Sequence, residues 1–175
     1  MPAKLFSIKK IVLMGEARVG KTSLVRRYVT GYFNPAYQIT LGTTIMKKEV
    51  EYIDQIISLS IWDVGGQEVF KQIRTKYFYG SSGALAVCDA ANRKSFERLP
   101  EWVDSFRAIV GEKPIMFLAN KVDLKNLEVT TEDMEELTRK YKNSNYMFTS
   151  AKEGINVEVA FYNLVRMMIE KEEPI

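Results

Sequence analysis

Residues 15–22 read GEARVGKT and stand between the apolar run IVLM (11–14) and the helix-like segment KTSLVRRYV (21–29). The pattern G-x-x-x-x-G-K-[ST] between a strand and a helix predicts a phosphate-binding loop; the alternative is a turn with two chance glycines. Gly15 and Gly20 let the backbone bend so that N–H groups converge on a phosphate, and the helix N-terminus adds its positive end. The motif therefore predicts a strand–loop–helix unit that binds a polyphosphate.

Each position of this phosphate loop (residues 15–22) has an expected role. Lys21 can reach the β- and γ-phosphates, and the Thr22 hydroxyl can ligate Mg²⁺. The predicted contact surface comprises Ala17, Arg18, Val19, Gly20, Lys21, Thr22 and Ser23. A nucleoside triphosphate site follows, with the base and the reaction still open.

Short β-branched and apolar runs recur along the chain and alternate with segments of helical spacing. The runs cover residues 7–14, 44–52, 56–63, 83–90, 114–119 and 145–150. Only Ile53, Asp54 and Gln55 separate the second run from the third, which predicts a hairpin. Two apolar stripes predict helix faces that pack on the core: Phe96, Leu99, Trp102, Val103, Phe106, Ile109 and Val110, and then Val157, Ala160, Phe161, Leu164, Val165 and Met168.

This alternation predicts an α/β fold in three layers. We expect a six-stranded, mostly parallel sheet with helices on both faces, joined by right-handed crossovers. No repeat or linker interrupts residues 1–175, so a single domain is expected. Ligands of such sheets sit outside the carboxyl ends of the strands, and functional residues should follow the apolar runs.

The composition excludes several kinds of site. The chain has no histidine, which rules out Ser-His-Asp and Cys-His catalysis and a histidine-ligated zinc site. Its single cysteine, Cys88, lies in the run GALAVCDA and is expected to be a small buried hydrophobe in a reducing compartment. A net charge of +3 with interspersed signs does not indicate nucleic-acid binding, and no apolar stretch is long enough to span a membrane.

A second polar motif, NKVD (120–123), follows the run PIMFLA (114–119). Guanine presents two adjacent N–H donors that one carboxylate can accept together, whereas adenine has an acceptor at N1. A carboxylate that faces this acceptor in a buried site costs free energy, so Asp123 is expected to select guanine. Asn120 either contacts the base edge or ties this loop to the phosphate loop, and the stem of Lys121 is expected to lie over a ring face. The alternative is a helix-capping turn.

SAK, that is Ser150, Ala151 and Lys152, is expected to complete the base pocket with a backbone N–H and the Lys152 side chain. In order, the chain carries GEARVGKT, Thr40, WDVGGQE (62–68), NKVD and SAK. On these motifs the sequence resembles the Ras superfamily of small GTPases over essentially its whole length. The resemblance implies the G-domain form of the P-loop NTPase fold. It also implies that the protein binds GTP and GDP with Mg²⁺ and hydrolyses GTP to GDP and phosphate.

The resemblance also assigns roles between the motifs. Phe33 precedes Thr40 by seven residues, where the family stacks an aromatic ring on guanine. Thr40 is expected to ligate Mg²⁺ through its side chain when the γ-phosphate is present. Thr43 and Thr44 compete for this role, but the spacing from the phosphate loop favours Thr40. Tyr37 is placed to close over the phosphates.

In WDVGGQE the resemblance implies three further roles. Asp63 would hold Mg²⁺, Gly66 would offer its backbone N–H to the γ-phosphate, and Gln67 would orient the attacking water. Gln67 and Lys21 are thus the predicted catalytic residues, acting by positioning and charge stabilisation.

Loss of the γ-phosphate would free Thr40 and Gly66, so that two loops, at about residues 33–44 (switch I) and 64–80 (switch II), would relax. The resemblance therefore implies a molecular switch in membrane trafficking or signalling. Its expected partners are an exchange factor, a GTPase-activating protein and effectors, which bind through the two switches.

Within the superfamily, YFNPAYQITLG, RTKYFYGSSGA and NRKSFERLPEWV look Rab-like, whereas DVGGQ is the form typical of Arf-like and Gα proteins. Ile45 replaces an aromatic residue of the Rab pattern, and Ala17 replaces a glycine of Ras. Gα proteins carry an arginine three residues before the switch I threonine, and this chain does not. Intrinsic hydrolysis is therefore expected to be slow until a partner supplies an arginine. Arg18 is either such a cation in cis or a solvated loop residue.

The printed sequence ends in EKEEPI and has Pro2 after its first residue, so it shows neither a prenylation cysteine nor a myristoylation glycine. We expect a cytoplasmic monomer, peripheral at a membrane only if a longer chain is lipidated or a partner recruits it. Two rivals remain: a P-loop kinase or ATPase, which NKVD argues against, and a catalytically inactive guanine-nucleotide-binding scaffold. The joint presence of Thr22, Thr40, Asp63 and Gln67 argues against the scaffold.

Overall fold

The apolar runs of the sequence form the strands of a sheet in the computed structural model, which describes residues 4–36 and 38–170. The strands are Leu5–Met14 (β1), Thr43–Tyr52 (β2), Gln55–Val64 (β3), Gly83–Asp89 (β4), Ile115–Asn120 (β5) and Ser144–Phe148 (β6). The helices are Lys21–Thr30 (α1), Lys71–Phe78 (α2), Arg93–Glu97 (α3), Leu99–Val110 (α4), Thr131–Lys140 (α5) and Val157–Glu170 (α6), with a short 3-10 helix at Glu68–Phe70 (η1).

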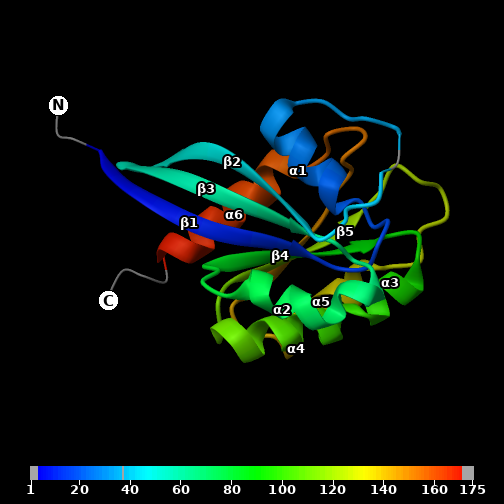
Figure 1. Ribbon diagram of the computed structural model, residues 1–175. Helices are drawn as coiled ribbons and strands as arrows, with labels where there is room; N and C mark the ends of the chain where they lie inside the picture. Colours follow the sequence, from blue (N-terminus) through cyan, green and yellow to red (C-terminus); the bar gives the residue numbers. More distant parts are fainter. Residues whose placement is uncertain (1–3, 37, 171–175) are drawn as a thin grey trace.

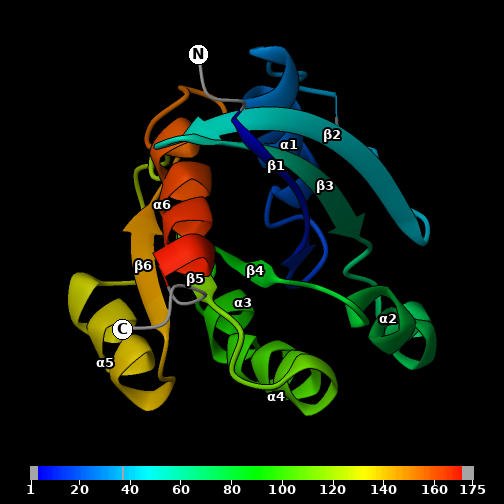
Figure 2. The ribbon, with the colours of Figure 1, turned by 90° about the vertical axis from the view of Figure 1, so that its left-hand side faces the viewer.

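The strands form one sheet in the order β2-β3-β1-β4-β5-β6. β2 and β3 pair antiparallel as a hairpin, and the other neighbouring strands pair in parallel. In Figure 2 this hairpin is a long curved ribbon at one edge of the sheet. The predicted α/β fold with one antiparallel strand is confirmed.

Helices cover both faces of the sheet (Figure 1). One core cluster joins α1 and α6 to the sheet, with Leu24, Tyr28 and Phe161 among its buried residues. The other joins α2, α4 and α5 to the opposite face, with Phe78 and Trp102 among its buried residues. Successive residues of the parallel strands alternate between the two clusters: in β1, Ile11 and Leu13 belong to the first and Val12 and Met14 to the second.

Two sequence predictions about the core differ in outcome. Cys88 is fully buried in β4, as expected of a small hydrophobe, and burial raises the pKa of its thiol to about 12. Ile109 was wrongly assigned to the core stripe, because its side chain is 40% exposed near the end of α4.

The loops that follow β1, β5 and β6 lie together on the right of Figure 1, where the parallel strands end. The N-cap residue of α1, Gly20, lies there; it adopts the left-handed conformation and offers no side-chain cap. α5 instead begins with a capping box between Thr130 and Asp133. The first N–H groups of α1 are therefore free of side-chain acceptors and point toward the loop cluster.

Candidate functional site

A cleft of about 320 Å³ opens at the carboxyl ends of the strands. Most of the predicted nucleotide contacts line it: Ala17, Arg18, Gly20, Lys21, Thr22, Ser23, Phe33, Thr40, Gly66, Gln67, Asn120, Lys121, Asp123, Ala151 and Lys152. Val19, Asp63 and Ser150 are buried next to these residues. Tyr37 lies outside the described residues. Residues spread over more than 130 positions of the chain thus meet in one cleft.

The phosphate loop has a backbone that few residues besides glycine can adopt. Gly15 has φ of 139° and Gly20 has φ of 103°, both in the range that side chains rarely adopt. A Cβ on Gly20 would lie 2.3 Å from Nδ2 of Asn120, so the loop also packs closely against the end of β5. Arg18 takes φ of 68° and is exposed at the lip of the cleft.

Lys21 is bonded within its own loop. Its Nζ donates to the carbonyls of Gly15 at 2.8 Å and Glu16 at 2.7 Å, and only 6% of the residue is exposed. Burial lowers the pKa of the Lys21 ammonium to about 8, against the opposing charges of Asp63 and Glu16. The loop therefore positions a desolvated cation at the floor of the cleft.

Three oxygen-bearing side chains converge beside Lys21. The Thr22 and Thr40 hydroxyls lie 2.7 Å apart, and Thr22 donates to Oδ2 of Asp63 at 2.5 Å. Oδ1 of Asp63 is buried without a hydrogen-bond partner. Burial raises the pKa of the Asp63 carboxyl, while the bond from Thr22 and the charge of Lys21 oppose that rise.

This oxygen set fits Mg²⁺, which prefers one or two carboxylates with hydroxyl, phosphate and water oxygens. The described residues contain no group of three His, Cys, Asp or Glu side chains that could hold a metal by themselves. A metal here would therefore complete its shell with further oxygens, such as those of a bound phosphate or of water. Of the competing threonines, Thr43 donates to the Asp63 carbonyl at 3.1 Å, a backbone contact, whereas Thr40 faces the carboxylate.

Switch II lies against the phosphate loop at Gly66. A Cβ on this residue would lie 2.3 Å from the Ala17 nitrogen and 2.6 Å from the Gly15 carbonyl oxygen. The neighbouring Gly65 donates its N–H to the Gly42 carbonyl at 2.8 Å, which ties switch II to switch I. The prediction of a loop throughout switch II is wrong, because Glu68–Phe70 form η1 and Lys71–Phe78 form α2.

Asn120 ties the base loop (residues 120–123) to the phosphate loop. Its Nδ2 donates to the Val19 carbonyl at 3.0 Å, and its Oδ1 accepts from the Thr149 hydroxyl and from the Ala151 N–H. Of the two roles expected for this side chain, the structure shows the tie between the loops.

Hydrogen bonds to neighbouring loops also hold the other polar side chains of the base loop. The Ser150 hydroxyl donates to Oδ1 of Asp123 at 2.5 Å. Lys121 Nζ donates to the Arg18 carbonyl at 2.6 Å and to Oδ2 of Asp89 at 2.7 Å, so its stem spans the gap between the two loops. The carboxylate of Asp123 lines the cleft beside this stem.

Sequence reasoning missed several residues of this region. Asn34, Pro35, Ala36, Gln38, Ile39, Arg26 and Leu124 also line the cleft. Glu16 and Trp102 support it from outside, because Nε1 of Trp102 donates to Oε1 of Glu16 at 2.9 Å. The position of Glu16 inside the phosphate loop was the only sequence signal for this contact.

The fold and the cleft together define a nucleoside triphosphatase of the P-loop class. A model of the Ras family matches residues 10–170. The chain is 34% identical to the Ras-related protein Rab7 of Drosophila melanogaster over 177 residues, which cover 98% of this chain and 86% of that protein. It is 37% identical to the Ras-related protein Rab-9B of Mus musculus over 169 residues, which cover 94% and 84%. It is 34% identical to the Ras-related protein Rab-7a of Dictyostelium discoideum over 179 residues, which cover 99% and 88%.

The chain belongs to the Ras family. It is a Rab-like small GTPase that hydrolyses GTP, which confirms the resemblance inferred from its motifs. These relatives favour neither the kinase or ATPase reading nor the inactive scaffold. No helix within residues 4–36 and 38–170 has both the length and the apolar character needed to cross a membrane.

Proposed function

We propose that residues 1–175 form a single G domain, acting as a monomer, whose cleft binds GTP or GDP with Mg²⁺. The phosphate loop and Lys21 would hold the phosphates, and Thr22, Thr40 and Asp63 would hold the metal ion. Bound Mg²⁺ neutralises charge on the β- and γ-phosphates. Asp123 would accept the two guanine N–H donors, with Phe33 and Lys121 on the ring faces and residues 150–152 behind the base.

One observation carries this proposal. The oxygens of Thr22, Thr40 and Asp63 lie within hydrogen-bond distance of one another, and both threonines line the same cleft as Lys21 and Asp123. An orphaned carboxylate oxygen on Asp63 provides a further ligand for a cation. Gln67 also lines the cleft, and we propose that it orients the attacking water.

The switch function follows from the two ties to the γ-phosphate. When this group leaves, Thr40 and Gly66 would lose their shared ligand and both switches would relax. We propose that exchange factors, GTPase-activating proteins and effectors recognise these segments, and that the output is membrane trafficking at a peripheral site reached from the cytoplasm.

The nucleotide that copurifies with the protein tests the base assignment. Acid release and chromatography should recover GDP or GTP, and chelation of divalent cations should speed the release of the nucleotide. Recovery of an adenine nucleotide would contradict the role of Asp123, and release that is indifferent to chelation would contradict the metal site.

A further inference from the structure

Arg74 belongs to α2, within switch II, yet its side chain is buried. The residue is 1% exposed, its guanidinium carbon lies 3.9 Å from the centroid of the Trp102 ring on α4, and its Nη2 donates to Oε1 of Glu101 at 3.1 Å. Arginine is almost never fully buried unless it is paired, and a cation over an aromatic face is held more strongly where water is excluded. Arg74 therefore anchors switch II on α4.

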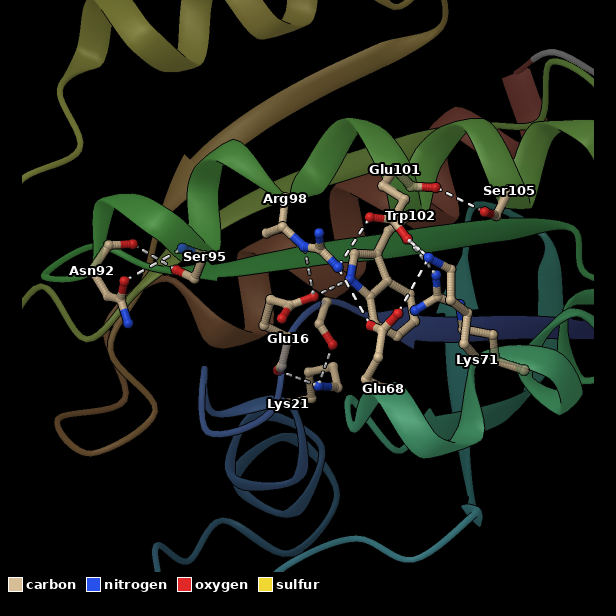
Figure 3. A network of polar contacts seen from close by, with 12 residues as sticks. Glu16, Lys21, Glu68, Lys71, Asn92, Ser95, Arg98, Glu101, Trp102 and Ser105 are labelled. Atoms are coloured by element: carbon tan, nitrogen blue, oxygen red, sulfur yellow. Dashed lines mark hydrogen bonds and ion pairs between the residues drawn. The ribbon is translucent and has the colours of Figure 1, made fainter.

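Trp102 continues this contact to the phosphate loop. Its Nε1–H donates to Oε1 of Glu16 at 2.9 Å, and Figure 3 shows the indole directed at this carboxylate. The backbone carbonyl of Glu16 in turn accepts from Nζ of Lys21. A continuous set of contacts thus runs from Lys21 through Glu16 and Trp102 to Arg74.

Arg98, the N-cap residue of α4, offers a second, exposed connection between the same two regions (Figure 3). It lies 3.7 Å from Oε1 of Glu16 through Nε and 3.3 Å from Oε2 of Glu68 through Nη2. The side chains of Arg98 and Glu68 are 43% and 61% exposed. Exposed ion pairs of this kind contribute little, so the buried contact of Arg74 with Trp102 is the stronger connection.

The hydrogen-bonding capacity of the buried Arg74 guanidinium is not fully used. Its Nη1 is buried and makes no hydrogen bond within the part of the chain that the structure describes. A buried donor without an acceptor opposes burial, whereas the ring and the Glu101 carboxylate favour it. Opposing contributions of this kind suit a segment that must leave its docking site and return during a switching cycle.

We propose that Arg74 is a positioning residue for GTP hydrolysis. Its stack on Trp102 holds α2 against α4 and thereby keeps the start of switch II in register with the phosphate loop. The inference rests on the roles proposed above for Gly66 and Gln67, which precede α2 in the chain. Arg74 does not line the nucleotide cleft, so its loss should change the rate of hydrolysis and the environment of Trp102 and leave nucleotide affinity nearly unchanged.

The test uses Arg74→Met, which keeps length and apolar contact and avoids stranding a buried charge. Lys71→Met is the matched control, because Lys71 bonds the same Oε1 of Glu101 at 2.6 Å from an exposed position. Arg74→Lys is the rescue variant, since it restores the charge without the planar guanidinium. All variants carry Trp62→Phe, which leaves Trp102 as the only tryptophan.

Three quantities are measured: single-turnover GTP hydrolysis, GDP affinity, and the change in tryptophan emission when GDP is replaced by a nonhydrolysable GTP analogue. We expect Arg74→Met to lower hydrolysis about tenfold, the effect of losing one modest transition-state contribution. GDP affinity should stay within about twofold of the parent, as for substitutions outside a binding site. The emission change should disappear in Arg74→Met, persist in Lys71→Met and return in part in Arg74→Lys.

A hydrolysis rate that stays at the parent level in folded Arg74→Met would overturn the proposal, and so would an emission change that survives. Parallel loss of hydrolysis and GDP affinity would also overturn it, because it would indicate general damage to the fold. The emission readout requires only nucleotide binding. Its loss in Arg74→Met therefore supports the coupling even if Gln67 proves to have no part in hydrolysis, and that second question is decided separately by Gln67→Leu.

Discussion

The base end and the phosphate end of the cleft differ in whether the protein itself supplies the hydrogen-bond partners of their polar groups. At the base end, Asn120 and Asp123 are already bonded to neighbouring loops, through Val19, Thr149 and Ser150 among others. At the phosphate end, Oδ1 of Asp63 has no partner and the first turn of α1 has no side-chain cap. The protein alone organises the base end, whereas the phosphate end needs a ligand. The base end should therefore stay constant through the nucleotide cycle while the phosphate end changes.

The largest expected effect comes from a substitution at the base end that changes which base the site accepts. Asp123→Asn replaces an acceptor by a donor. The site should therefore reject guanine and accept xanthine, whose base edge has an acceptor in place of a guanine donor. We expect the ratio of the two affinities to change by about 10⁴, because buried polar groups would otherwise stay unpaired. Competition between GDP and xanthosine diphosphate measures it.

Ser150→Ala provides the control for this variant. It removes the hydroxyl that donates to Asp123 and leaves the carboxylate in place. It should weaken both nucleotides without reversing their order, and a reversal would show that the hydrogen bond, not the carboxylate, selects the base.

A smaller effect is expected from obstructing the phosphate end. In Gly66→Ala the added methyl would collide with the backbone of Ala17 and Gly15, which must push switch II away from the phosphate loop. Hydrolysis should fall about a hundredfold, as when one oxyanion donor is removed, while GDP affinity stays close to that of the parent. Single-turnover assays and GDP titrations measure the two quantities. A rate equal to that of the parent would mean that switch II approaches the phosphates by another route.

The smallest effect is expected at Arg18, where the two ends meet. Its carbonyl accepts from Lys121, a backbone contact that survives substitution of the side chain. Hydrolysis in Arg18→Ala should therefore stay within about twofold of the parent. Arg18→Gly is the control for backbone strain, because φ of 68° suits glycine better than alanine. A large fall in both variants would assign Arg18 as a catalytic cation in cis.

The fold and most of the cleft could be predicted because their chemistry follows the ends of apolar runs. The phosphate loop, Asp63, the base loop and residues 150–152 each directly follow a strand or lie at its end, and parallel strands end on the same side. These motifs also use residue types that suit only a few kinds of ligand. Local pattern and topology together were therefore sufficient to bring Lys21 and Asp123 into one site.

The support behind the cleft could not be predicted in the same way. Trp102 was interpreted only as part of a core stripe, because its N–H partner, Glu16, is 86 positions away in the sequence. Arg74 lies in a polar stretch of α2, and nothing local distinguishes a buried arginine from an exposed one. Ile109 was placed in the core since periodicity says nothing about where a helix extends past its sheet. Each case depends on which elements pack together in three dimensions.

The first turn of α1 has a consequence for the survival of the protein. Because these N–H groups have no side-chain acceptor and converge only in the folded chain, a bound nucleotide lowers the free energy of the folded state alone. At one hundred times the dissociation constant, a ligand of this kind raises the free energy of unfolding by about 2.7 kcal/mol. A fall in the guanine-nucleotide pool would thus leave more of this chain unfolded and open to proteolysis, so that cellular abundance itself would report on nucleotide supply.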